Sequence, residues 1–180
     1  MLAALALACA APLIGAHLVH ESWPPERRMN TGELIDPLPL PETVLWRLDG
    51  TPFHFSELKG RWIMVQLDEA RCAEACRKKL YQMRQVRLAQ GRDMHRIERL
   101  WLVADDAPVA APLIGEFAGT HVLRARDSRL LARFPAQRDL REHIYLIDPL
   151  GNLMLRYPRD ADPSGMKRDL ARLLKLSRLG

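Results

Sequence analysis

Cysteine and aromatic residues are scarce in this chain, and it has no internal repeat or low-complexity tract. Three cysteines occur in 180 residues, and aromatic side chains make up 6% of the sequence. Cys9 lies in an apolar N-terminal segment, so the rest of the chain holds a single pair, Cys72 and Cys76. A disulfide-stapled scaffold needs several pairs and structural zinc needs four ligands, so both classes are disfavoured. The pair is typical of a redox-active or metal-binding dithiol.

Aromatic or glycine-rich nucleic-acid motifs are also absent. The net charge is +5 and the isoelectric point is near 9.4. These basic residues are spread through arginine-rich segments that resemble solvated helix faces, not a concentrated patch. We therefore expect no nucleic-acid partner, whereas the positive charge can steer an acidic protein partner.

No lysine or arginine precedes the long apolar run from Leu2 to Val19. That run is long enough to span a bilayer, which takes about 17–25 residues. We predict an export signal or membrane anchor at residues 1–20. Residues 21–41 are predicted to be a linker, because their prolines disfavour a long helix or a central strand. Residues 42–180 then form one domain, which is large enough to bury a proper core.

The stretch of residues 61–80 carries the clearest chemical signal. Trp62 to Leu67 is mostly apolar and β-prone, which indicates a buried central strand. Cys72 and Cys76 follow at i and i+4, so a helix beginning at Arg71 or Cys72 stacks both sulfurs on one face, at the mouth of the sheet. The unpaired amides of a first turn favour a thiolate, as do nearby cations. The cations in this stretch are Arg71, Arg77, Lys78 and Lys79.

The remaining apolar segments predict an α/β fold, with a sheet between helices. Further strands are expected at 44–48 and 97–104, and a hairpin at 144–148 and 153–157. The cysteine-bearing helix is expected to continue to Gln90, and Pro163 to Leu179 has the pattern of an amphipathic helix.

Several of these segments match the pattern of a known family. They are Asp49-Gly50, Leu58-Lys59-Gly60, the strand led by Trp62, Cys72-Ala73-Glu74-Ala75-Cys76, and Tyr145-Leu146-Ile147-Asp148-Pro149-Leu150-Gly151. The chain resembles thioredoxin-like proteins of the Sco type over roughly residues 40–178. The most specific feature is the three-residue gap between the cysteines, where ordinary thioredoxins have two residues.

The resemblance implies a thioredoxin-like domain anchored to a bacterial-type inner membrane, on its periplasmic side. It also implies copper, as Cu(I) or Cu(II), and a partner that is a cytochrome c oxidase subunit or another copper protein. Its metal ligands are Cys72, Cys76 and a histidine just before the strand that contains Tyr145. The matching position here holds Leu140, and His143 lies three residues further on. Because strand side chains alternate, this displacement predicts His143 on the opposite face unless the loop rearranges.

Three functions follow from these observations. In the first, Cys72 and Cys76 hold Cu(I), with or without His143, and pass it to an oxidase subunit or keep the cysteines of its copper site reduced. In the second, the chain is a thiol-disulfide oxidoreductase of broader range, in which an exposed Cys72 attacks and Cys76 resolves. The cis-proline position of such enzymes is unfilled, since no proline lies between Pro135 and Pro149. In the third, the disulfide is structural in a non-catalytic scaffold.

Overall fold

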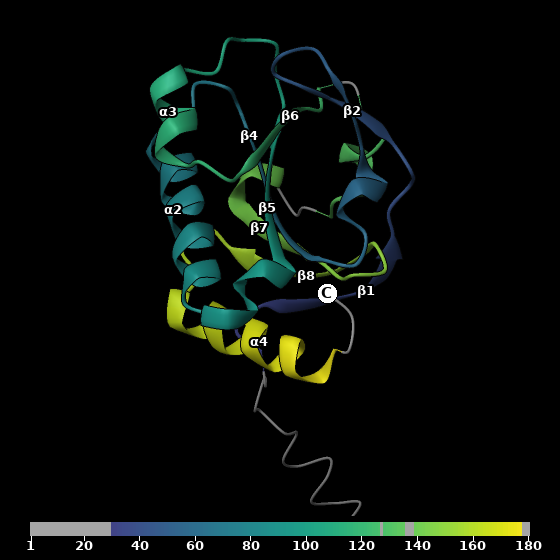
Figure 1. Cartoon of the computed structure of the whole chain (residues 1–180), viewed down its shortest axis with the longest axis vertical. Helices are drawn as coiled ribbons and strands as arrows, with labels where there is room; N and C mark the ends of the chain where they lie inside the picture. Colours follow the sequence, from purple (N-terminus) through teal and green to yellow (C-terminus); the bar gives the residue numbers. More distant parts are fainter. Residues whose placement is uncertain (1–29, 127, 136–138, 178–180) are drawn as a thin grey trace, which may run out of the picture.

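A computed structural model describes residues 30–126, 128–135 and 139–177 (Figure 1). The predicted anchor at residues 1–20 therefore lies outside the described residues. Within the described ranges, no helix has the length and apolar character that crossing a membrane requires.

The described residues form one mixed sheet of eight strands in the order β1-β8-β7-β4-β5-β6-β2-β3. The strands are β1 (Glu33–Pro39), β2 (Val44–Arg47), β3 (Pro52–His54), β4 (Trp62–Asp68), β5 (Ile97–Val103), β6 (His121–Arg124), β7 (His143–Ile147) and β8 (Asn152–Pro158). The α-helices are α2 (Glu74–Leu88), α3 (Ala111–Glu116) and α4 (Pro163–Leu176). Strands β4, β5 and β6 are parallel, whereas β7 runs antiparallel to β4 and to β8. The predicted α/β class and the β7–β8 hairpin are confirmed.

Strand β4 is central because both of its faces are covered. Its residues from Trp62 to Leu67 are all buried, and alternate side chains enter two separate apolar clusters. Trp62 and Met64 pack with residues of α2, α3 and α4, whereas Val65 and Leu67 pack on the other side. A strand buried on both faces has an almost continuous apolar sequence, which is the pattern that identified this one.

The sequence analysis predicted helices on both faces of the sheet, and the structure differs from this prediction. Among the described residues, the three α-helices contribute buried side chains to the cluster on one face only. The opposite cluster is closed by the β2–β3 hairpin and by short 3-10 turns, which include Phe55–Leu58 and Leu131–Arg133. These segments are too short for an α-helix to be stable, so large apolar residues such as Phe53 and Phe134 cover this face instead.

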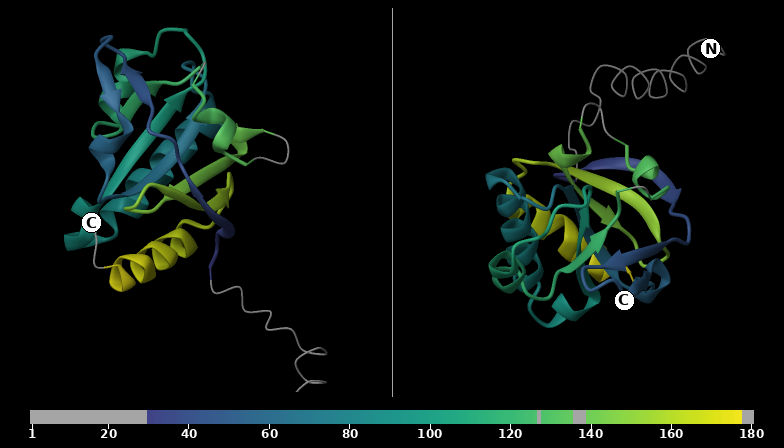
Figure 2. Two further views of the ribbon diagram at one scale, coloured as in Figure 1. Left: turned by 90° about the vertical axis from the view of Figure 1, so that its right-hand side faces the viewer. Right: turned by 90° about the horizontal axis from the view of Figure 1, so that it is seen from above.

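Part of the predicted linker belongs to the domain. Strand β1, which lies within residues 21–41, pairs with β8 at the edge of the sheet (Figure 2). Glu33 receives two hydrogen bonds from the guanidinium of Arg156, each 2.8 Å long. Asp169 on α4 accepts the backbone N–H groups of Thr31 and Gly32, at 2.7 and 3.1 Å. An edge strand tolerates proline because one side of its backbone has no strand partner.

The contact between α4 and the start of the described chain leaves no room for a methyl group at Gly165. A Cβ there would lie 2.2 Å from Thr31 Oγ1 and 2.8 Å from Thr31 Cβ. We expect Gly165→Ala to lower the free energy of unfolding by about 1–3 kcal/mol, as overpacking does. Gly115→Ala in α3 is the matched control, because nothing lies within 4 Å of its Cβ position and alanine favours helix. Urea unfolding of both variants checks this prediction, which is wrong if Gly165→Ala is as stable as the wild type.

Candidate functional site

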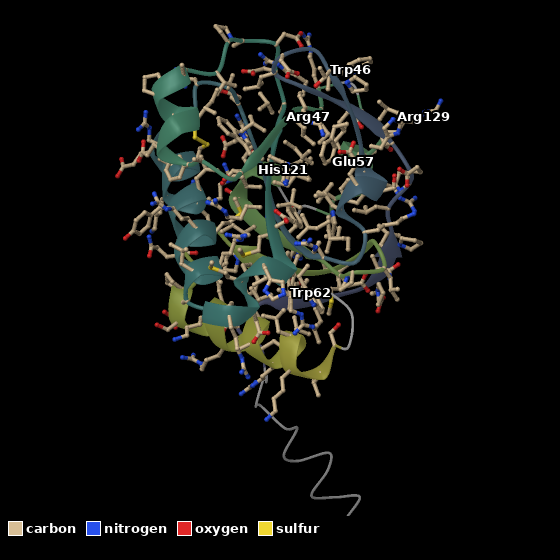
Figure 3. All side chains as sticks on the ribbon, in the orientation of Figure 1. Trp46, Arg47, Glu57, Trp62, His121 and Arg129 are labelled. Carbon is tan, nitrogen blue, oxygen red and sulfur yellow. A yellow bond between two sulfur atoms is a disulfide. The ribbon has the colours of Figure 1, made fainter. Side chains whose placement is uncertain are left out.

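The two cysteines of the domain are joined to each other at the junction of β4 and α2. A disulfide links Cys72 to Cys76, with their Cα atoms 5.0 Å apart. Figure 3 shows it as the yellow bond at the end of α2 nearest α3. Cys76 lies in the first turn of α2, whereas Cys72 lies in the preceding loop, where its φ is +44°. The helix therefore begins at Glu74, later than the predicted start at Arg71 or Cys72, because a residue in the left-handed region cannot continue a right-handed helix.

Both cysteines are buried, which corrects the expectation of an exposed Cys72 at the mouth of the sheet. Cys72 is 2% exposed and Cys76 is 1% exposed. They share an apolar cluster with Leu113 and Phe117, which lie in and just after α3. The sequence pattern placed them correctly at a strand-to-helix junction but could not show that they are buried in a cluster to which α3, about 40 residues further along the chain, contributes. A partner can reach the disulfide only after local rearrangement of the surrounding side chains or of the Cys72 loop.

The positive charge near the sulfurs is arranged differently from the prediction. Arg71, Arg77 and Lys78 are exposed, but Lys79 has no exposed surface. Its ammonium forms an ion pair with Asp68 at 2.9 Å and donates to the carbonyl oxygen of Arg141 at 2.6 Å. Burial lowers the pKa of Lys79, and the charge of Asp68 opposes that change. Lys79 thus ties the cysteine-bearing helix to β4 and to the segment before β7.

A buried glutamine contacts the inner sulfur. Gln66, with no exposed surface, lies on the same face of β4 as Met64 and directs its side-chain amide to Cys76. Nε2 donates to Cys76 Sγ across 3.3 Å. The sequence analysis missed Gln66 and Asp68 as parts of the site, whereas it had named Lys79 among the cations near the sulfurs. Gln66 was detectable as the one polar residue within an otherwise apolar central strand, but its direction was not.

His143 is not brought to the sulfurs. It opens β7, where Ile144 pairs with Gln66 and so lies on the disulfide-bearing face. His143 lies on the opposite face, with its ring centroid 5.6 Å from that of Tyr145, which belongs to the other apolar cluster. Leu140 packs against that cluster too. Within the described ranges, no three His, Cys, Asp or Glu side chains are grouped as metal ligands would be.

The placement of His143 predicts a pH dependence of stability. Burial, followed by the charge of Arg156, lowers the pKa of His143 from 6.5. The unfolded chain then binds this proton more readily than the folded chain, so stability is present above pH 6.5 and falls as the pH drops below it. We expect urea midpoints to fall less below pH 6.5 for His143→Gln than for the wild type. His54→Gln, at the exposed edge strand β3, is the control. Parallel pH profiles for His143→Gln and the wild type would contradict the prediction.

A cavity of about 520 Å³ opens at the carboxyl ends of β4 and β5, beside the loop that leads to Cys72. Its charged lining is Glu69, Asp105, Asp139 and Arg141. Arg141 pairs with Glu69 and with Asp139, and its hydrogen bond holds the pKa of Asp139 below its usual value. Asp105 accepts the N–H of Ala70, at 3.0 Å, and so fixes the loop between β4 and Cys72. The apolar part of its lining, which includes Leu131 and Leu140, belongs to the cluster on the face of the sheet opposite the disulfide.

Comparison with known protein families agrees with the observed fold. A family model described as "Transmembrane-like, thioredoxin-like, C-terminal domain" matches residues 62–177. No protein of curated function matches the chain by sequence.

Several solved structures share the fold. Copper-bound ScoI of Bradyrhizobium japonicum is 19% identical with a TM-score of 0.60, and the match covers 74% of this chain and 98% of that one. Copper-bound yeast Sco1 is 16% identical with a TM-score of 0.66, covering 79% and 96%. The thioredoxin domain of a thiol-disulfide oxidoreductase from Bacteroides vulgatus is 16% identical with a TM-score of 0.57, covering 78% and 99%. The resemblance to Sco-type proteins is thereby confirmed at the level of the fold.

Proposed function

Because the chain belongs to the thioredoxin-like family whose model matches residues 62–177, we propose that it is a thiol-active assembly factor for cytochrome c oxidase or another copper protein. Its Cys72–Cys76 pair cycles between dithiol and disulfide and keeps the cysteines of a copper site reduced. The observation that carries this proposal is the disulfide at the start of α2, with Gln66 aimed at Cys76. Residues 1–20 would anchor the domain on the periplasmic side of a bacterial-type inner membrane, where disulfides persist.

The exchange reaction assigns separate roles to the two sulfurs. In the dithiol form, the Cys72 thiolate attacks a partner disulfide, and one partner thiolate leaves and takes up a proton. The Cys76 thiolate then attacks Cys72 in the mixed disulfide, which releases the second partner thiol and restores the Cys72–Cys76 disulfide. Cys72 is the attacking sulfur because it lies in the loop, whereas Cys76 lies within α2 and contacts Gln66. Because Cys72 is buried, its loop or the side chains packed around it must rearrange before it reacts.

Exchange with a peptide of two disulfide-linked cysteines tests this function. The reduced full-length protein should reduce the peptide while its own Cys72–Cys76 disulfide reforms, as followed by mass spectrometry after alkylation. The double variant Cys72→Ser, Cys76→Ser is the control for background exchange. A rate no higher than that of free glutathione would end the proposal.

Cu(I) binding is the second form of the same function. Two thiolates are soft ligands that suit Cu(I), and copper would be cargo passed to the partner. The copper-bound ScoI and Sco1 structures favour this form because they share the fold. The chain itself offers two sulfurs and, among its described residues, no grouped third ligand. Two-coordinate binding of Cu(I) by Cys72 and Cys76 is therefore the form that these residues fit.

Burial of both sulfurs favours a third candidate, a scaffold with a structural disulfide. Cys72 and Cys76 pack among apolar side chains, as an inert bridge would. Alkylation of the reduced, folded protein separates the candidates. In an exchange-active protein, iodoacetamide should alkylate Cys72 faster than Cys76. In an inert protein, neither sulfur should be alkylated until the chain unfolds. Full activity of the double Cys→Ser variant in cells would also establish the scaffold.

A further inference from the structure

Lys79 is a fully buried cation that the exchange reaction does not itself require. Its ammonium pairs with Asp68 at 2.9 Å and donates to the carbonyl oxygens of Leu67, at 3.3 Å, and Arg141, at 2.6 Å. A buried ion pair seldom stabilises a fold more than apolar side chains of similar size. Packing alone therefore gives no reason for a lysine at this position, and its surroundings indicate what the charge does.

Those surroundings place Lys79 beside the inner sulfur. Lys79 follows Cys76 by three residues, so both side chains lie on the same face of α2 and point toward β4. Three consecutive residues of β4 contact these two side chains. Gln66 donates a hydrogen bond to Cys76 Sγ, the carbonyl oxygen of Leu67 accepts one from the Lys79 ammonium, and Asp68 forms the ion pair with it. The side-chain oxygen of Gln66 has no hydrogen-bond partner in the described part of the chain, so its amide is directed at the sulfur alone.

This arrangement suits a reduced sulfur better than an oxidised one. A disulfide sulfur is neutral and a weak acceptor, whereas a thiolate is an anion and accepts strong, charge-assisted hydrogen bonds. The N–H of Gln66 and the charge of Lys79 therefore stabilise the reduced pair more than the disulfide. Asp68 acts against this effect through its negative charge but keeps the ammonium in place. In a low-dielectric interior these charges act with little screening.

We propose that Lys79 is a positioning residue which, with Gln66, stabilises the reduced Cys72/Cys76 pair and so raises its reduction potential. The proposal rests on the redox cycle of the proposed function and adds what regulates that cycle. A raised potential increases the fraction of the pair that is reduced in an oxidising compartment, while it lowers the driving force for reducing a partner disulfide. Through the carbonyl of Arg141, Lys79 also holds the segment before β7 against the dithiol helix.

Redox titration of the full-length protein tests this proposal. The protein is equilibrated at fixed pH with glutathione buffers or, if these do not reduce it, with dithiothreitol. Reduction of the disulfide by glutathione consumes two thiols and yields one glutathione disulfide, so the equilibrium constant follows from the reduced fraction measured after alkylation. Lys79→Met should lower that equilibrium constant about tenfold, which corresponds to a reduction potential lower by about 30 mV. Gln66→Met should also lower the equilibrium constant. Lys78→Met, the same change at the exposed neighbouring residue, should leave it unchanged.

A purely structural role would give a different result. It would lower the free energy of unfolding equally in the oxidised and reduced forms and leave the equilibrium constant as in the wild type. Unchanged constants in both Lys79→Met and Gln66→Met overturn the proposal, and Gln66→Met decides the matter if Lys79→Met does not fold. The titration needs neither copper nor a partner. A protein that fails to reduce the cysteine peptide but shows these shifts would thus refute the proposed function and leave the present inference standing.

Discussion

Cys76→Ser is expected to trap the protein on its partner. Without the resolving sulfur, the mixed disulfide formed by Cys72 cannot proceed to the Cys72–Cys76 disulfide and can only revert through the peptide's own second thiol, so turnover is lost and the adduct is trapped once alkylation blocks that thiol. Cys72→Ser should also lose turnover but should form no adduct, because Cys76 is held within α2 and by Gln66, whereas Cys72 lies in a loop. The measurement is non-reducing mass spectrometry after each reduced variant is mixed with the oxidised two-cysteine peptide.

These two variants control for each other. Each loses the same disulfide, whose short loop contributes about 2 kcal/mol in the chain-entropy model. A general loss of stability would therefore affect both alike and cannot explain an adduct in only one. If Cys72→Ser accumulates the adduct instead, the roles of the two sulfurs are reversed. If neither variant forms one, the buried disulfide is inert and the scaffold candidate gains support.

The second large effect is expected in copper binding. The reduced protein should bind one Cu(I), and Cys72→Ala should lose it, since a single thiolate cannot form the two-sulfur site. His143→Ala should keep the wild-type affinity, because this histidine lies on the face of β7 opposite to Gln66 and Cys76. Competition with a colorimetric Cu(I) chelator measures the Cu(I) affinity of the wild type, Cys72→Ala and His143→Ala.

Two results would contradict this expectation. Retention of tight Cu(I) binding by Cys72→Ala would mean that the copper lies elsewhere. A large loss of affinity in His143→Ala would mean that the segment before β7 rearranges on reduction and brings the histidine to the sulfurs. His121→Ala is the matched control, since His121 pairs with Glu98 at 3.3 Å on strands β6 and β5.

The main elements of the fold could be predicted from sequence because their signals are local. Strand β4 has a continuous apolar sequence, and the β7–β8 hairpin has two apolar runs around a turn at Pro149 to Asn152. Edge strand β1 was assigned to a linker, because Pro37 and Pro39 suppress the local strand signal. Its place in the sheet depends on pairing with β8, more than 100 residues away, and on the hydrogen bonds from Asp169.

The candidate site likewise has features that were predictable from the sequence and features that were not. The spacing of Cys72 and Cys76 after a buried strand predicted that the two sulfurs lie together, but the reason was wrong: Cys72 reaches Cys76 from the loop before α2 and not from the same helical turn. The alternation of strand side chains also predicted the face on which His143 lies. Lys79 was predicted to add positive charge near the sulfurs, but its burial against Asp68 and the contact of Gln66 with Cys76 were not predictable, because in sequence these residues resemble two surface charges and an ordinary strand residue.

By itself, the sequence determined that this chain has one pair of cysteines at a strand-to-helix junction, because short-range periodicity indicates where the strand ends and the helix follows. Only the tertiary structure decided how that pair is surrounded. It buries the sulfurs in an apolar cluster, sets Gln66 against Cys76 and buries the charge of Lys79 beside Asp68. Burial and electrostatic environment arise from contacts between segments distant in the chain, and no local pattern records them.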